Sequence, residues 1–447
     1  MNLAARDAPF LDSLRTLRCA AAVVVHGSAL RAAKALHLSQ PAVTRAIQKL
    51  EHVCGVALFE RGGRGMAATV PGRLVSRRTQ ALLLLLEQGA KAAHALGARH
   101  HVALCSAQHF AARVTPSSLQ ALAAIALCGS EARAATHLQI TPATVHRVLE
   151  QLQHLVGVHL FHRSTHGTRL TPAGDALLHR VQLAFAELRA LHADLAPWRG
   201  EVRGELVIGA LPLSVSLLLP TAVDAVFRAH PALKIRAVDG TYESLVQQLL
   251  RADIDLLLGA LRFPPPDGIQ QKVLMEDSLA VVAQAGHPVF ALPKPGLADL
   301  LAHEWVLPLP HSPAESALHR AFAQAGLPPP TSRLYAGSPT LTRAVVLQTG
   351  RLALASLAEA LGPEAAPLCI VPIPLPQTVR HIGMAWRSEG ETAADLTSLL
   401  DVLQGTYAAA KPGPKKWLHR SAAITPISMS QSGAGQALSL AYTGAKP

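Results

Sequence analysis

The sequence predicts two tandem winged helix-turn-helix units joined by long helices, followed by an α/β domain. Three observations predict this fold. Residues 17–72 match residues 119–174 without a gap, at 21 of 56 positions. The first 200 residues carry 22 Lys and Arg against 10 Asp and Glu, whereas the rest carry 19 of each. After Gly204, short apolar runs typical of buried strands alternate with helical patterns, which predicts a parallel sheet in an α/β domain.

Composition narrows the class of protein. The chain has 447 residues, half of them apolar, and a net charge of +12, which indicates a polyanionic partner. Its scattered cysteines predict free thiols in a reducing cytosol, rather than disulfides or a zinc site; they are Cys19, Cys54, Cys105, Cys128 and Cys369. We expect no signal peptide and no membrane-spanning segment, and therefore a cytoplasmic protein.

Each repeat unit contains the helix-ending and helix-capping residues expected of three short helices and a wing. In the first unit Gly27 is expected to end a helix, and Ser28 and Ser39 to cap the two that follow. Two short helices joined by a tight turn predict a helix-turn-helix. The predicted elements are helices over 17–26, 29–36 and 40–54, and wing strands over 56–59 and 66–69.

The third helix of each unit is the candidate DNA reader. Its apolar side faces inward and leaves Gln40, Thr44, Arg45, Gln48 and Lys49 outside, where Gln suits adenine and Arg suits guanine or phosphate. A solvated polar face is the alternative, but the wing and the charge excess favour DNA binding. The candidate DNA-binding residues are Ser39, Gln40, Pro41, Thr44, Arg45, Lys49, Arg61 and Arg64 in the first unit, and Thr141, Pro142, His146, Arg147, Arg163 and Arg169 in the second.

The first unit resembles the DNA-binding domain of LysR-type transcriptional regulators. The resemblance rests on the run SQPAVTR and on the start of the wing, GVALFER. The second unit is similar but has Thr141-Pro142-Ala143 where Ser39-Gln40-Pro41 stands, while its LTPAG run, 170–174, matches the family better. The usual family member has one such domain, so the second copy is a departure.

A long helix is expected from Gly174 to about Ala196. Its apolar residues step by four and three, which predicts a seam for a paired helix; they are Leu177, Val181, Ala184, Leu188, Leu191 and Leu195. The family resemblance implies that this helix joins subunits into a dimer or tetramer, and packing on its own domain is the alternative. A similar helix over 72–97 is expected to have its seam broken at Gln88 and Gly89, and 98–116 to be a connection.

The neutral half is expected to alternate strands and helices. The predicted strands cover 206–210, 233–238, 254–259, 279–283, 305–309, 352–355 and 380–387, and the helices 217–230, 242–252, 313–325, 340–348 and 393–406. The family resemblance implies a two-lobed effector domain similar to periplasmic binding proteins. The expected boundaries are 12–72 and 117–174 for the winged units, 73–116 and 175–200 for the linkers, 202–283 plus 384–410 for lobe one, 284–383 for lobe two, and 411–447 for a disordered basic tail.

A small-molecule effector is expected between the lobes, at turns where strands end and helices begin. Helix N-termini there offer free N–H groups to an anion, although Ser and Thr at such turns also serve as ordinary caps. An organic acid or a sugar-like metabolite is the candidate effector. The candidate ligand-binding residues are Ser214, Thr241, Ser312, Ser338 and Thr340, with Arg262-Phe263 ranked lower.

These observations predict a ligand-responsive transcription regulator that binds duplex DNA, with RNA polymerase as a further candidate partner. We expect no catalytic residue, no cofactor and no metal. The spacing of His159, His162 and His166 would suit a metal on a helix, but these residues straddle the predicted wing. The alternative is a small-molecule binding protein whose helix-turn-helix units serve assembly.

Overall fold

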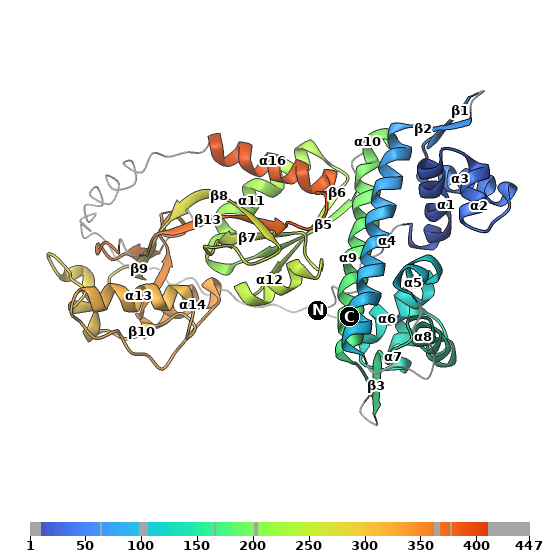
Figure 1. The fold of residues 1–447 in the computed structure, drawn as a ribbon. Coiled ribbons are helices and arrows are strands. Elements are labelled where there is room, and N and C mark those ends of the chain that lie inside the picture. The colour runs from blue at the N-terminus through green and yellow to red at the C-terminus, as the bar shows by residue number, and fades with distance from the viewer. Residues whose placement is uncertain are drawn as a thin grey trace, which may run out of the picture. The chain divides into compact units, whose positions relative to one another are not determined.

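The computed structural model of the chain describes residues 10–62, 65–97, 106–164, 167–200, 204–361, 367–375 and 378–409. Up to residue 200 the described chain is helical apart from two short hairpins, and from residue 204 it forms two sheets with helices (Figure 1). This order confirms the predicted fold class. The basic tail over 411–447 lies outside the described residues.

The two repeat units fold alike. The first consists of α1 (Leu14–His26), α2 (Ala29–Ala35), α3 (Gln40–Cys54), β1 (Phe59–Gly62) and β2 (Gly65–Ala68). The second consists of α6 (Pro116–Cys128), α7 (Glu131–Leu138), α8 (Pro142–Val156), β3 (Phe161–Ser164) and β4 (Gly167–Leu170). Gly27 and Gly129 end the first helix of each unit at φ +71° and +68°. Ser28 and Ser130 then cap the next helix through the backbone N–H of Arg31 and Arg133.

The junction between wing and long helix is built identically in both units. The hydroxyl of Thr69 accepts from Gly72 N–H and donates to the Ala57 carbonyl, and Thr171 makes the two matching bonds. A Cβ on Gly72 would lie 2.0 Å from the Leu58 carbonyl oxygen, so only glycine fits there. Gly174 has the same constraint at 2.2 Å from the Leu160 carbonyl oxygen. The two units therefore share the junction between wing and long helix as well as their fold.

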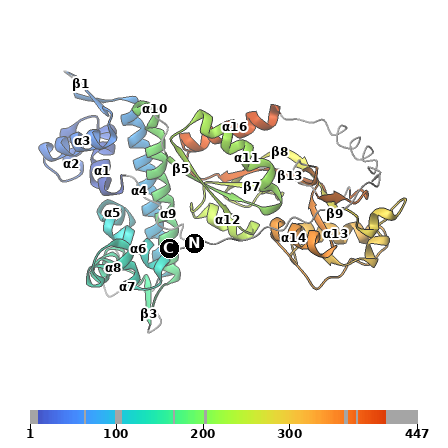
Figure 2. The same cartoon turned by 180° about the vertical axis from the view of Figure 1, so that it is seen from behind.

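Two long helices follow the wings, α4 (Val70–Leu96) and α9 (Pro172–Asp194), and they pack side by side in opposite directions (Figures 1 and 2). All six predicted seam residues are buried, and within this chain α9 packs against α4. The repeat explains this, because α4 carries the same seam 102 residues earlier. Its buried seam positions are Val75, Thr79, Leu82, Leu86, Gly89 and Ala93.

The expected break in the seam of α4 is absent. Gly89 is buried on the seam, where a Cβ would lie 3.0 Å from both the Leu177 Cδ1 and the Arg180 Cβ atoms. The glycine therefore admits α9 at close range instead of interrupting the contact. Gln88 is half-buried beside the seam. The connection after α4 also contains a short helix that sequence patterns did not indicate, α5 (Ala107–Arg113), and α9 continues into the single turn α10 (Ala196–Arg199).

The first lobe contains a five-stranded sheet in the order β6-β5-β7-β13-β8. Strands β6, β5 and β7 are parallel, whereas β13 runs antiparallel to both of its neighbours, so the sheet is mixed rather than purely parallel. Its elements are β5 (Gly204–Ala210), α11 (Pro212–Ala229), β6 (Leu233–Asp239), α12 (Tyr242–Leu250), β7 (Leu256–Ala260), β8 (Ile269–Asp277), β13 (Arg380–Arg387) and α16 (Ala394–Ala409).

The second lobe contains a four-stranded sheet in the order β10-β11-β9-β12. Its elements are β9 (Leu279–Gln284), β10 (Trp305–Val306), α13 (Pro313–Gln324), α14 (Pro339–Thr349), β11 (Leu352–Ser356), α15 (Leu357–Ala360) and β12 (Leu368–Ile370), with 3-10 turns at Pro288–Ala291 and Asp299–Ala302. Trp305 and Phe322 are fully buried in its core and meet edge to face.

The lobe boundaries differ from those expected. Strand β9 was assigned to lobe one, but it pairs with β11 and β12 in the second sheet. Strand β13 begins at Arg380, so lobe one resumes earlier than position 384. An apolar run such as 279–283 predicts a buried strand but not which sheet receives it. The chain therefore crosses between the lobes at residue 278 and again before residue 380.

No single helix among the described residues has both the length and the apolar character needed to cross a membrane. The pair α5 and α6 reaches those criteria only when taken together, and the chain bends by 101° between them.

The intrachain seam predicts a stability effect that does not depend on protein concentration. Leu188 is 1% exposed on α9, so Leu188→Ala should lower the free energy of unfolding by about 2–5 kcal/mol. Leu84, half exposed on α4, is the control, and Leu84→Ala should change it by no more than about 0.5 kcal/mol. Urea unfolding over a wide range of protein concentrations measures both. A midpoint for the unsubstituted chain that rises with concentration would place the seam between subunits.

Partly buried histidines predict a loss of stability in mild acid. Burial, and then a neighbouring cation or histidine, lowers the pKa of His179, His192 and His287 below the ordinary 6.5. Because the unfolded chain then binds more protons than the folded chain, the free energy of unfolding should fall as the pH drops below about 6.5. His192→Gln should flatten this dependence. Urea unfolding at about pH 7.5 and about pH 5.5 tests it, and an unchanged slope in the variant would contradict it.

Candidate nucleic-acid interface

Helix α3 presents a polar face to solvent because its apolar face is packed in the core of the unit. Val43, Ile47 and Leu50 are at most 1% exposed in the core of the unit. Gln40 and Arg45 lie exposed on the opposite side, as do Pro41, Gln48 and Lys49, while Thr44 is half-buried and donates to the Gln40 carbonyl. The structure therefore brings the predicted reading residues of the first unit onto one exposed helix face.

The two recognition helices begin differently. Ser39 and Thr141 occupy the N-cap positions, and both are exposed. The Thr141 hydroxyl accepts from Thr144 N–H at 3.2 Å, whereas the Ser39 hydroxyl makes no capping hydrogen bond to the described residues. Pro41 and Pro142 lie in the first turn, where the missing proline N–H has no helical partner to lose. The Ser39 hydroxyl is thus left available at the start of α3.

Each recognition helix is tied to its own wing. The Glu51 carboxylate on α3 accepts from the backbone N–H of Leu58 and Phe59 at 2.8 and 3.1 Å. In the second unit the side chain of Gln153 accepts from Leu160 N–H at 2.9 Å. These hydrogen bonds fix the start of each wing against the recognition helix of the same unit. Arg61 belongs to β1, but its side chain lies outside the description, and so does all of Arg64.

The second unit neutralises part of its own basic surface. Arg163 on β3 forms ion pairs with Glu131 at 2.8 Å and with Glu150 at 2.6 Å. The other oxygen of Glu131 lies 3.1 Å from Nδ1 of His146 on the recognition helix. Arg147 and Arg169 remain exposed. Only part of the predicted cationic set of this unit therefore faces solvent without an acidic partner.

The first unit lacks both glutamates. Shifting by the repeat length of 102 residues places Ala29 at the position of Glu131 and Gln48 at that of Glu150. The two units thus share a fold but present different charge at their recognition surfaces. Sequence comparison alone shows the substitutions, but only the structure shows that both carboxylates reach Arg163.

In the α/β domain, three of the predicted ligand residues cap helices. Thr241, Ser312 and Ser338 accept from the third backbone N–H of α12, α13 and α14, at 3.3, 3.2 and 3.4 Å. Thr340 lies exposed in the first turn of α14. Ser214 lies in α11, and its side chain is outside the description. The capping role that was the alternative is therefore real for three of the five residues.

The lower-ranked pair Arg262-Phe263 has partners within its own lobe. Arg262 forms an ion pair with Glu243 at 2.7 Å, and its guanidinium lies 4.0 Å from the centre of the Tyr242 ring. Phe263 meets His381 edge to face. These contacts hold the loop after β7 against α12 and β13.

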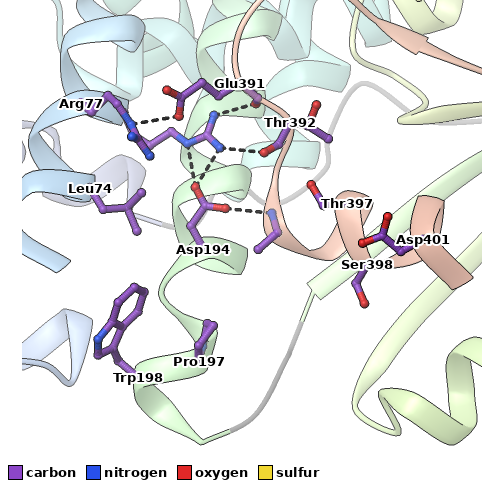
Figure 3. Close-up of a pocket in the computed structure, with 12 residues that line it drawn as sticks. Leu74, Arg77, Asp194, Pro197, Trp198, Glu391, Thr392, Thr397, Ser398 and Asp401 are labelled. Carbon is purple, nitrogen blue, oxygen red and sulfur yellow. Dashed lines mark hydrogen bonds and ion pairs between the residues drawn. The ribbon is translucent and has the colours of Figure 1, made fainter. Parts of the chain in front are cut away.

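Two pockets lie where the long helices meet the α/β domain, and neither is lined by any of the five predicted ligand residues. One measures about 460 Å³ and lies open to solvent between α4, the end of α9 and the start of α16. Figure 3 shows Arg77 paired with Glu391 beside this pocket, and Asp194 on the end of α9 close by. This junction did not emerge from sequence patterns.

Arg78 is the centre of that junction. It is 3% exposed, and its guanidinium donates to Asp194 at 2.8 Å, to Glu187 at 3.0 Å and to the Glu391 carbonyl at 2.9 Å. Burial alone would lower the pKa of Arg78, but the carboxylates of Glu187 and Asp194 outweigh it and raise the pKa above its ordinary value. The one available sequence signal was that Arg78 and Arg180 are equivalent in the repeat.

Among the described residues, no group of three or more His, Cys, Asp or Glu side chains is arranged to hold a metal ion. His159 precedes β3 and His162 lies within it, while His166 is outside the description.

Two family models match the chain. The model described as LysR substrate binding domain matches residues 199–408. The model described as bacterial regulatory helix-turn-helix protein, lysR family, matches twice, at residues 14–73 and 116–175. The second match covers the repeat that sequence comparison identified.

Known proteins resemble the chain over most of its length. The HTH-type transcriptional regulator GalR of Pseudomonas putida is 31% identical over 383 residues, which is 85% of this chain and 93% of that protein. The HTH-type transcriptional regulator PcaQ of Agrobacterium fabrum is 24% identical over 65% of this chain and 94% of its own length. Full-length CbnR, solved with its target DNA, has a TM-score of 0.50 at 22% identity, over 65% of this chain and 98% of that one.

We expect DNA affinity to rise when a glutamate that pairs with the cations of the second unit is removed. Glu131→Ala frees Arg163 and His146 from one carboxylate, so binding to mixed-sequence duplex DNA should strengthen several-fold. The slope of log affinity against log salt should steepen by about one. Glu276→Ala removes the same charge from an exposed site in the α/β domain and serves as the control. Equal gains in the two variants, measured by fluorescence anisotropy, would contradict a local effect.

Proposed function

This chain belongs to the LysR family of transcriptional regulators, and from that premise we propose a division of labour between its two helix-turn-helix units. The first unit specifies the DNA sequence, and the second anchors the chain on the phosphate backbone. The observation that carries this proposal is the difference in the exposed residues of the two units. Pro142 stands in the second unit where the first has Gln40, while the cations Arg147 and Arg169 stay exposed. His146 is bound to Glu131, whereas the first unit has Ala29 in place of that glutamate.

The reading set of the first unit consists of Gln40 and Arg45, which suit base edges, with Ser39 and Thr44 beside them. Lys49 and the wing residues Arg61 and Arg64 would contact phosphate. In the second unit the exposed Arg147 and Arg169 would grip the backbone, with Thr141 and Pro142 at the start of the helix. This arrangement is supported by the exposure of Gln40 and Arg45 on a helix whose other face is fully packed.

The two-lobed domain is the effector-binding domain of the family. We propose that its effector is a small organic anion or a sugar-like metabolite held between the lobes, where Thr241, Ser312 and Ser338 begin helices. Ser214 and Thr340 would complete the set. Effector binding would then change how the chain controls transcription at its target genes, in contact with RNA polymerase.

Within this chain the seam of α9 packs against α4, which supports our proposal that any dimer or tetramer forms through other surfaces. The proposal places the chain in the cytoplasm, together with its DNA. A second candidate function is assembly without DNA reading, and only the contact between α4 and α9 favours it. Assembly alone would leave the exposed face of α3 without a role.

The test is to map the DNA that the full chain binds. Genome-wide mapping in the source organism should show discrete sites, and purified chain should shift those fragments at physiological salt. A chain that binds no fragment more tightly than bulk DNA would overturn the proposal and favour the assembly role. Genes beside the bound sites would indicate the chemical class of the effector, which calorimetry can then check.

The two units predict different responses to substitution. Gln40→Ala or Arg45→Ala should cost about 1–3 kcal/mol at a mapped site and much less on unrelated DNA, because each removes a base contact. Arg147→Ala should weaken all sequences alike and reduce the salt slope by about one, as the loss of a phosphate contact does. Titrations of specific and mixed-sequence duplexes at several salt concentrations measure both. If Arg147→Ala instead removes sequence preference, the assignment of the two units is reversed.

A further inference from the structure

The α4/α9 pair relates the two repeat units by an approximate two-fold rotation. The helices are equivalent in the repeat, run in opposite directions and use the same six seam positions. Gly89 near the end of α4 meets Leu177 near the start of α9, and Arg78 near the start of α4 meets Asp194 at the end of α9. Two equivalent helices that pack in this way imply a two-fold axis across the middle of the pair.

Each unit is also held by the long helix of the other. His94 on α4 makes a hydrogen bond of 2.7 Å with the carbonyl of Val156, the last residue of recognition helix α8. Arg199, after α9, donates at 2.7 Å to the carbonyl of Cys54, the last residue of recognition helix α3. Cys54 and Val156 are equivalent in the repeat. The contacts are therefore reciprocal, as they would be between two subunits of a symmetric dimer.

We propose that one chain is a complete, covalently joined pair of DNA-binding units, and that its target is a duplex with two unlike half-sites. The half-site under the first unit is strongly specified in sequence, and the half-site under the second is weakly specified and held mainly through its phosphates. This inference rests on the proposed function. Two-fold related readers contact inverted half-sites at a fixed spacing. In a dimer of identical units the half-sites match, but here the reading positions differ. Gln40 and Thr44 in the first unit correspond to Pro142 and His146 in the second.

The proposal also explains how the repeat diverged. The residues at the junction of wing and long helix keep the same hydrogen bonds in both units through Thr69 and Thr171, and the seam stays buried, for example at Leu86 and Leu188. Among the reading positions, Ser39, Gln40 and Thr44 have different residues in the second unit, while Arg45 keeps its arginine as Arg147. A covalent pair tolerates such changes, because each unit meets only its own half-site.

The first test uses DNA selected by the full chain from a random-sequence duplex pool, followed by hydroxyl-radical footprinting. We expect two protected tracts at a fixed spacing, one with a strong and one with a weak sequence preference. Inserting about 5 base pairs, half a helical turn, between the tracts should weaken binding several-fold, because it turns the weakly specified tract away from the second unit. A single tract, or indifference to the insertion, overturns the inference but leaves the proposed function standing. Failure to select any sequence overturns both.

The second test asks whether the two readers act within one chain. One variant disables the first reader, Gln40→Ala with Arg45→Ala, and another disables the second, Arg147→Ala with Arg169→Ala. When the two variants are co-expressed and purified together, affinity for the selected duplex should stay at the level of the single variants. Recovery of a high-affinity fraction would show that readers pair across chains and would overturn the inference.

A matched control removes two exposed charges elsewhere, Arg228→Ala with Lys234→Ala in the effector domain, and should keep the full affinity. Because the substituted side chains are all exposed, loss of folding is not expected, and circular dichroism checks it. Cutting the reciprocal contacts with His94→Ala and Arg199→Ala should leave both readers intact but make binding less sensitive to the insertion. Unchanged sensitivity would show that these contacts do not set the spacing.

Discussion

The packing of α4 against α9 is the contact on which the other parts of the structure depend. Each helix begins at the wing of one unit and ends at the recognition helix of the other. The seam is apolar, and its stabilisation comes from removing both faces from water, with Gly89 allowing the closest approach. If the helices separated, neither unit would keep its orientation relative to the other.

The same helix pair carries the effector domain through Arg78. A buried guanidinium costs desolvation, so the pairing with Glu187 and Asp194 contributes orientation more than net stability. The carbonyl of Glu391 and the N–H of Ala394 bring the segment before α16 onto this pair. Arg180, the repeat equivalent of Arg78, binds the same segment through Glu389. The two arginines thus join one effector domain to a helix pair with two readers.

Because the two units are encoded separately within one chain, each can acquire its own substitutions while the arrangement stays nearly symmetric. Where one sequence encodes both readers, a change at a reading position alters both half-sites together. Here Glu131 and Glu150 could arise in the second unit alone, binding Arg163 while the first unit kept Ala29 at the matching position. The residues shared at the junction of wing and long helix meanwhile kept the same local geometry in both units.

The sequence by itself determined the repeat, the helix-turn-helix units, the exposed face of α3 and the seam of α9. These features are local or periodic, and spacing along the chain is enough to reveal them. It did not determine which partner covers the seam, because an apolar stripe is buried equally well by a second subunit or by α4. Strand β9 posed the same problem, since an apolar run fits either sheet. The ion pairs of Arg78 with Asp194 and of Arg163 with Glu131 join residues 116 and 32 positions apart. Only the tertiary structure could bring such residues together, because no local pattern records a contact between distant segments.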